Sequence, residues 1–279
     1  MRTASIPAWV AELVHRYRAA GADGVYTTGT DGEMHVLEWD DFRTLVDAFA
    51  RAITATSMPA QAGCSWSHTD GVIRRIRYAS ERGIPCVQVA LPSWVPLDDD
   101  EVRRFFAALA SACPDVWIVH YNIARAGRFL TGKDYRAILA VAPTLIGTKQ
   151  TGGDVASLIE IVAATPSLQH FVVDHQIVPG ALFGARGFYS FLANLNPRFT
   201  RNLWQACERG DWTEAARLRV MVEACFRDWL AMPGMVTASP ALAKIAARAG
   251  IYPEMPLRVP RSLSERHAGP SGCPAAAAA

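Results

Sequence analysis

Residues 116–122 read Val-Trp-Ile-Val-His-Tyr-Asn, and residues 145–149 read Leu-Ile-Gly-Thr-Lys. Each is a short apolar run that reaches a chemically reactive side chain at its end. The amphipathic stretch 131–141 between them is long enough for a crossover helix, which predicts two parallel strands. Parallel barrels place their catalytic groups at the carboxyl ends of the strands. The two runs therefore predict that Tyr121 and Lys149 lie at the same end of a parallel sheet.

The same strand-helix unit recurs along most of the chain. Apolar runs predict strands at residues 25–28, 59–63, 85–91, 116–121, 145–148, 171–173 and 187–190. Amphipathic stretches predict helices at residues 7–20, 40–54, 69–82, 98–112, 131–141 and 154–164. This alternation is typical of a parallel α/β fold, and the length suits a (β/α)8 TIM barrel.

The two ends of the chain depart from a plain barrel. Only Met1 to Ser5 precede the first predicted helix, so the first strand is short or missing. After residue 190 the pattern is wholly helical (197–208, 212–230, 240–249), and residues 253–279 are rich in Pro, Gly, Ser and Ala. We therefore predict a barrel over residues 1–192, a C-terminal helical appendix over 193–252 and a flexible tail over 253–279.

The composition favours a small-molecule enzyme. The net charge is +2 with the charges scattered, which argues against nucleic acid or an anionic membrane as a partner. No run approaches the roughly 20 apolar residues that span a bilayer. The six cysteines occur singly, without metal-ligand spacing, so we expect most of them to be buried thiols, with no metal site and a cytoplasmic location.

Lys149 and Tyr121 are the candidate catalytic residues. Only three of the 28 basic residues are lysines, and a desolvated lysine at a strand end can attack a carbonyl, which an arginine cannot. A phenol nearby could relay the protons of that reaction. The alternatives are a lysine that extends to solvent or pairs with a carboxylate, and a core tyrosine whose hydroxyl is satisfied locally.

The turn of residues 28–33, Thr-Gly-Thr-Asp-Gly-Glu, follows the first predicted strand. Backbone amides in such a turn, with the Thr30 hydroxyl, could hold a substrate carboxylate. Most short glycine-rich turns simply reverse the chain, and this alternative stays open.

Four segments together resemble one family, that of dihydrodipicolinate synthase and N-acetylneuraminate lyase. Residues 29–33 (GTDGE) are similar to its GTTGE or GSTGE signature, residues 121–123 (YNI) to its YN(I/V), and residues 147–149 (GTK) to its GxK strand. Residues 184–197 (GARGFYSFLANLNP) are similar to its GxxGxISxxAN(x)xP segment. The resemblance covers about residues 11–249.

The resemblance implies roles for particular residues. Lys149 would form an imine with a 2-oxo acid such as pyruvate, without any cofactor, and Tyr121 would shuttle protons. Gly29 and Thr30 would help bind the keto acid's carboxylate, and Ser190 is a further candidate for substrate binding. Family members are commonly homotetramers built from dimers, so a homotetramer or homodimer is implied.

Several residues depart from the family pattern. Asp31 stands where a second hydroxyl residue is usual, and two carboxylates about 4 Å apart repel by ~1 kcal/mol even in water. We expect Asp31 to turn away or to pair, with Arg125 as a candidate partner, or else to accept hydrogen bonds from substrate hydroxyls. Trp94 or Ser93 stands where the synthases carry a relay tyrosine.

Residues 124–128 also lack the PxRTG arginine motif by which those synthases recognise their second substrate. These departures count against lysine biosynthesis. Residues 92–106 (PSWVPLDDDEVRRFF) instead resemble hydratase-aldolases acting on aromatic ylidene-pyruvates, in which Trp94 could form an aromatic wall.

The expected function is carbon-carbon bond cleavage or formation between a 2-oxo acid and an aldehyde. The resemblance to hydratase-aldolases extends this expectation to a coupled hydration step. The alternatives are 4-hydroxy-tetrahydrodipicolinate synthase, a sugar-acid dehydratase that uses the same imine, and a barrel that binds a keto acid without turning it over.

Overall fold

The computed structural model describes residues 6–230, and the chain divides into two compact units. One unit comprises Met1–Pro59 and Ser190–Ala279, and the other comprises Ala60–Tyr189. The expected short first strand, the helix at 240–249 and the tail at 253–279 lie outside the described residues. The predicted boundaries after residues 192 and 252 therefore stay predictions.

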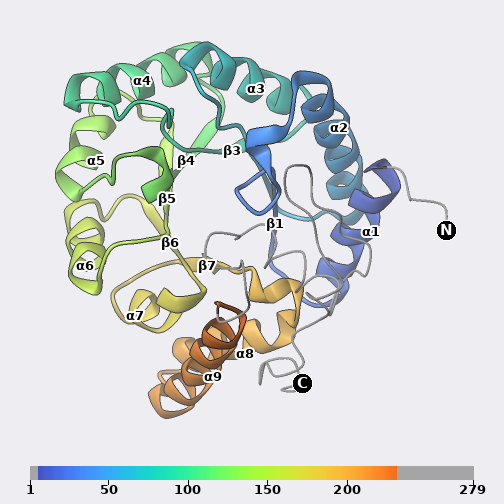
Figure 1. Cartoon of the computed structure of the whole chain (residues 1–279), viewed down its shortest axis with the longest axis vertical. Coiled ribbons are helices and arrows are strands. Elements are labelled where there is room, and N and C mark those ends of the chain that lie inside the picture. The colour runs from blue at the N-terminus through green and yellow to red at the C-terminus, as the bar shows by residue number, and fades with distance from the viewer. Residues whose placement is uncertain (1–5, 231–279) are drawn as a thin grey trace. The chain divides into compact units, whose positions relative to one another are not determined.

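The second unit contains a parallel sheet whose strands follow one another in chain order. Its strands are β2 (Ala60–Gly63), β3 (Cys86–Val89), β4 (Trp117–Asn122), β5 (Leu145–Gln150), β6 (Gln169–Val173) and β7 (Gly187–Tyr189). The connecting helices are α3 (Thr69–Glu81), α4 (Asp99–Ala112), α5 (Gly132–Leu139), α6 (Val155–Ala164) and α7 (Ile177–Leu182). Figure 1 shows α3 to α6 on the outer side of these strands, which is the predicted β/α repeat.

Helix capping accounts for several boundaries of the second unit. The prediction started α4, α5 and α6 at Asp98, Thr131 and Asp154, and these residues are the N-caps, one position before each helix. The side chain of each N-cap accepts a hydrogen bond from a backbone N–H in the first turn of its helix, as Asp, Thr and Ser caps commonly do. In α4 and α5 a carboxylate at the third helical position completes a capping box.

Helix α7 is not among the predicted helices. This short helix contains Pro179 and Gly180, both poor helix formers, directly after the 3-10 turn η3 (Asp174–Gln176). Gly180 is needed for packing, because a Cβ there would lie 2.7 Å from a methyl group of Val172 on β6. Close contact with the sheet thus overrides local helix propensity.

The first unit is mainly helical. It contains α1 (Ile6–Ala19), β1 (Val25–Thr27), η1 (Met34–Val36), α2 (Trp39–Thr56), η4 (Leu192–Asn194), α8 (Pro197–Glu208) and α9 (Trp212–Leu230). Helix α1 packs against α2, and α8 packs against α9. Among the described residues, no helix is both long and apolar enough to cross a membrane.

Candidate active site

Lys149 is buried at the carboxyl end of β5, with 8% of its surface exposed. It is the register partner of Tyr121 on β4, and its Nζ lies 4.0 Å from the centre of the Tyr121 ring. The prediction that Lys149 and Tyr121 lie close together at the strand ends is therefore confirmed. The strand continues through Gln150, two residues beyond its predicted end, so the lysine belongs to the sheet itself.

A second aromatic ring approaches the same amine. Lys149 Nζ lies 4.8 Å from the centre of the Tyr189 ring at the end of β7. The Tyr189 ring in turn meets Phe171 of β6 edge to face, with the ring centres 5.5 Å apart. The lysine is thus bordered by aromatic side chains from strands on both sides of β5.

The hydroxyl of Tyr189 is engaged by two glutamines that sequence reasoning missed. It donates a hydrogen bond to Gln61 Oε1, and Gln88 Nε2 lies 3.5 Å from the same oxygen. Burial raises the pKa of Tyr189, which the amide contacts only partly offset. The available signal was a polar glutamine within each of two short, otherwise apolar strands.

The opposite face of the same strands carries a buried chain of hydrogen bonds. His170 Nε2 lies 3.0 Å from the carbonyl of Thr165, so it donates, and His170 Nδ1 accepts from the Thr148 hydroxyl at 2.8 Å. Gln150 Nε2 donates to that hydroxyl oxygen at 2.8 Å, and Asn122 Nδ2 donates to Gln150 Oε1 at 2.9 Å. Thr148 and Gln150 flank Lys149, so this chain fixes the strand segment that carries the lysine.

His120 belongs to the same polar layer, as strand alternation predicts for the residue before Tyr121. Its Nδ1 lies 2.8 Å from the hydroxyl of Tyr135 on α5, and that hydroxyl also receives a longer bond of 3.5 Å from Gln150 Nε2. Burial lowers the pKa of His120 to about 3, so the imidazole is neutral. His120 is therefore structural, and it faces away from Lys149.

Thr148→Val should lower the free energy of unfolding by about 1–3 kcal/mol. The substitution removes the hydroxyl that donates to His170 Nδ1 and accepts from Gln150 Nε2, so one buried acceptor and one buried donor each lose a hydrogen bond. Urea unfolding of the two proteins measures this difference. Thr44→Val is the matched control, since the exposed Thr44 hydroxyl only bonds its own helix at Asp40 O. Equal stability of the two variants would contradict the importance of the buried chain.

Acidification should destabilise the protein through His120. Its pKa is about 3 in the folded state against 6.5 when unperturbed, so between these values the unfolded state binds more protons. The contribution is complete above about pH 6.5 and decreases below it by about 1.4 kcal/mol per pH unit, or about 2 kcal/mol at pH 5. Urea unfolding at pH 7 and pH 5 should show a smaller pH effect in His120→Gln, whereas His15→Gln, at an exposed position, should match the wild type.

The turn of residues 28–33 lies in the first unit and has a strained backbone. Thr28 and Glu33 adopt φ values of 60° and 56°, which is uncommon for any residue with a side chain and rare for a β-branched one. The prediction extended β1 through Thr28, but this left-handed residue ends the strand at Thr27. Gly29 is required by packing, because a Cβ there would lie 2.6 Å from the Tyr26 ring.

The hydrogen bonds within the turn limit which of its backbone amides could bind an anion. The amides of Glu33 and Met34 donate to Thr30 O and Gly29 O within the turn, so they are not available to a carboxylate. Thr30 and Asp31 are partly buried, and the Asp31 charge contributes, after burial, to raising the pKa of Tyr17 on α1. Asp31 and Arg125 belong to different units, and their pairing stays a prediction.

The remaining predicted site residues have varied surroundings. Trp94 is 92% exposed in the loop after β3, and Arg125 is exposed on the turn η2 (Ala124–Ala126) after β4. Arg128 is held by Asp99 at 2.6 Å and Asp134 at 2.7 Å. The Ser190 hydroxyl accepts a hydrogen bond from the amide of Ala193 in the first unit.

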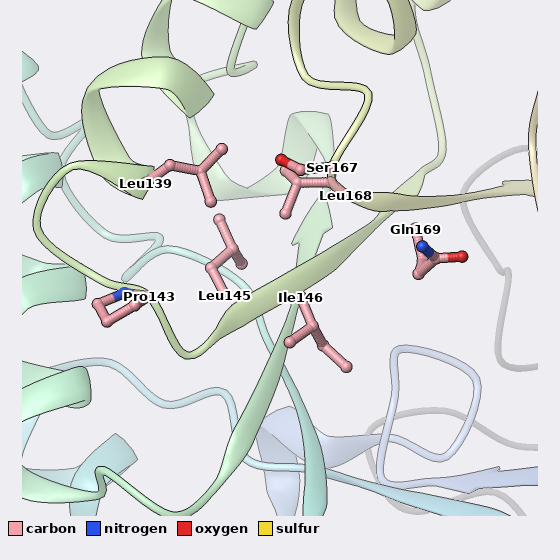
Figure 2. Close-up of a pocket in the computed structure, with 7 residues that line it drawn as sticks. All are labelled: Leu139, Pro143, Leu145, Ile146, Ser167, Leu168 and Gln169. Atoms are coloured by element: carbon pink, nitrogen blue, oxygen red, sulfur yellow. The ribbon is translucent and has the colours of Figure 1, made fainter.

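A shallow pocket lies at the other end of β5 and β6. It is lined by Leu139, Pro143, Leu145, Ile146, Ser167, Leu168 and Gln169. Figure 2 shows Leu145 directed toward Leu139 and Ile146 directed to the other side of the strand. Leu145 is four residues before Lys149, or about 13 Å along a strand. The side chains that line this pocket are mainly apolar and include no ionisable group, so Lys149 and its neighbours remain the candidate active site.

The comparisons with known proteins identify the family of the chain. Residues 8–266 match the sequence model of the dihydrodipicolinate synthetase family. The chain therefore belongs to this family of lyases, the class I aldolases that react through a Schiff-base lysine. A curated relative, 4-hydroxy-tetrahydrodipicolinate synthase of Exiguobacterium sibiricum, is 28% identical over 254 residues, which cover 88% of this chain and 84% of the relative.

Solved structures confirm the predicted (β/α)8 fold class. Dihydrodipicolinate synthase from Aquifex aeolicus superposes with a TM-score of 0.84 at 20% identity, covering 94% of this chain and 88% of that one. YagE, a prophage protein of the same family from E. coli K12 in complex with pyruvate, gives a TM-score of 0.83 at 20% identity, with coverage of 92% and 88%.

Proposed function

We propose that this protein is a carbon-carbon lyase that captures a 2-oxo acid such as pyruvate on Lys149 and joins it to, or releases it from, an aldehyde. The observation that carries the proposal is the buried Lys149 amine, 4.0 Å from the centre of the Tyr121 ring at the ends of two paired strands. Family membership and the pyruvate-bound relative YagE support the choice of keto acid.

The chemistry follows from these side chains. Neutral Lys149 adds to the C2 carbonyl, and loss of water gives an iminium that withdraws electrons from the adjacent carbon-carbon bond. Addition and dehydration both need proton transfer, which we assign to the Tyr121 hydroxyl. Thr30 and the turn of residues 28–33 are proposed to bind the carboxylate, by resemblance to the family's signature.

The acceptor is proposed to be an aromatic aldehyde, as in hydratase-aldolases. Trp94, exposed in the loop after β3, is the candidate for an aromatic wall against it. Asp31, Arg125 and Ser190 remain proposed substrate contacts. A homodimer or homotetramer is also proposed, by analogy with the family.

The principal alternative is 4-hydroxy-tetrahydrodipicolinate synthase, the name carried by the curated relative from Exiguobacterium sibiricum. That activity needs a second-substrate arginine after Tyr121. Arg128 is committed to two carboxylates and the carbonyl of Leu97, while Arg125 stands out of register with the family motif. The structure thus favours a different aldehyde.

Product analysis separates these functions. The protein would be incubated with pyruvate and a panel containing aromatic aldehydes and the synthase's own aldehyde substrate, and the products identified by mass spectrometry. We expect condensation products with aromatic aldehydes. Turnover of only the synthase substrate would establish the alternative, dehydration of a sugar acid would indicate a dehydratase, and pyruvate binding without any product would indicate a binding protein.

A further inference from the structure

Lys149 Nζ has an aromatic ring on either side of its strand. The ring centres of Tyr121 and Tyr189 lie 4.0 Å and 4.8 Å from the nitrogen, both within the roughly 6 Å over which a cation is attracted to a π face. The two rings come from β4 and β7, on opposite sides of β5 in the sheet.

Tyr189 is fixed in place from two directions. Phe171 meets its ring edge to face, and Gln61 accepts the hydrogen bond from its hydroxyl. Phe171 itself occupies space left open on β7, because Gly187 is its register partner and a Cβ there would lie 3.2 Å from the Phe171 ring. The hydroxyl is committed to Gln61, so the available part of Tyr189 is its ring.

The residue type at position 189 differs from the one in the family's sequence pattern. In residues 184–197, Tyr189 stands where the pattern GxxGxISxxAN(x)xP has isoleucine. An aliphatic side chain could fill this space, but it has no negative π face to present to a cation. The substitution therefore adds an interaction with charge at this position.

We propose that Tyr189 is a positioning residue for the Schiff base, whose ring, with that of Tyr121, forms an aromatic clamp around the positive charge on Lys149. This inference rests on the proposed function, since it concerns the imine of the same lysine. The clamp consists of the rings of Tyr121 and Tyr189.

The charge balance shows what the clamp does. Lysine ammonium and a ketone give a protonated imine and water, so the positive charge stays on nitrogen from the resting state to the captured state. The neutral amine that attacks, and the neutral enamine formed when the imine loses a C3 proton, lack that charge. The clamp therefore favours the two cationic states over the two neutral ones.

Other titratable groups near the lysine affect how a pH profile is interpreted. They include the two clamp tyrosines and Cys86 of β3, which lies next to Tyr189, while Phe171 from β6 does not ionise. Burial raises the pKa of Cys86 to about 11 and raises that of Tyr189 as well. A pH profile below about pH 9 should therefore report on the lysine.

The test measures pyruvate capture by borohydride trapping at several pH values in Tyr189 variants. Tyr189→Phe keeps the ring, Tyr189→Leu removes it, and progressively fluorinated phenylalanines at position 189 keep the shape while weakening the π face. We expect the pH midpoint of capture to fall by about one unit in Tyr189→Leu, and in steps along the fluorinated series. Tyr189→Phe should resemble the wild type.

The same interaction predicts a second signature. Above the pH midpoint of capture the resting lysine is neutral, so formation of the protonated imine creates a positive charge. Pyruvate affinity in this pH range should weaken about tenfold in Tyr189→Leu, because the ring that stabilises that charge is missing. Below the pH midpoint both the resting lysine and the imine carry the positive charge, so pyruvate affinity should be the same in Tyr189→Leu and the wild type. A role in packing alone would produce neither the fluorine dependence nor this difference between the two pH ranges.

The outcomes distinguish this inference from the function on which it rests. If wild-type protein is never trapped, the proposed function fails and the clamp with it. If the wild type is trapped but the fluorinated series and Tyr189→Leu follow the Tyr189→Phe profile, the clamp is overturned and the proposed function stands.

Discussion

Lys149→Arg should abolish pyruvate capture and reduce hydrogen-deuterium exchange at the pyruvate methyl group by at least about a thousandfold. Exchange requires only imine and enamine formation, so it can be measured by NMR before the aldehyde is known. Arginine keeps the positive charge but stays protonated and cannot attack a carbonyl. The loss should therefore reflect missing nucleophilic chemistry.

Lys133→Arg is the matched control, because Lys133 is exposed on α5 in the same unit. It should leave exchange unchanged. Undiminished exchange in Lys149→Arg, with the variant folded, would assign the chemistry to another group.

Tyr121→Phe should slow methyl exchange by about 100- to 10,000-fold, the usual range for a lost general acid or base. The ring that lies 4.0 Å from Lys149 Nζ is retained, so the clamp around the charge is retained as well. Because a proton shuttle lowers the barrier in both directions, the amount of imine trapped after long incubation should remain near that of the wild type.

Comparison of the exchange rate with the final trapped amount checks this prediction. Tyr78→Phe is the control, since Tyr78 is a buried tyrosine on α3 whose hydroxyl accepts from Arg82. A wild-type exchange rate in Tyr121→Phe would move the proton-transfer role to another residue.

The sequence was sufficient to predict the order of strands and helices, because burial on both faces leaves continuous apolar runs and the crossover helices alternate with them. It failed where tertiary contacts decide the outcome. Helix α7 forms despite Pro179 and Gly180, since Gly180 lets the helix approach Val172 closely. Strand β1 stops at Thr27 because Thr28 is left-handed, which no propensity predicts.

The pairing of Lys149 with Tyr121 could be predicted, since both end apolar runs in consecutive βα units. The involvement of Tyr189 could not, because it depends on how the sheet curves to bring β7 within 4.8 Å of Lys149 Nζ. The glutamines that hold Tyr189 were missed for the same reason. Gln61 and Gln88 lie on β2 and β3, far from Tyr189 in the sequence, and only the folded sheet brings them to its hydroxyl.

The most direct test of the central claim is borohydride reduction of the wild-type protein in the presence of pyruvate, followed by intact-mass measurement and peptide mapping. The Schiff-base mechanism predicts one pyruvate-sized adduct per chain, located on Lys149 in the peptide that spans residues 145–150. Folded protein that yields no adduct, or an adduct only on Lys133 or Lys244, would contradict it.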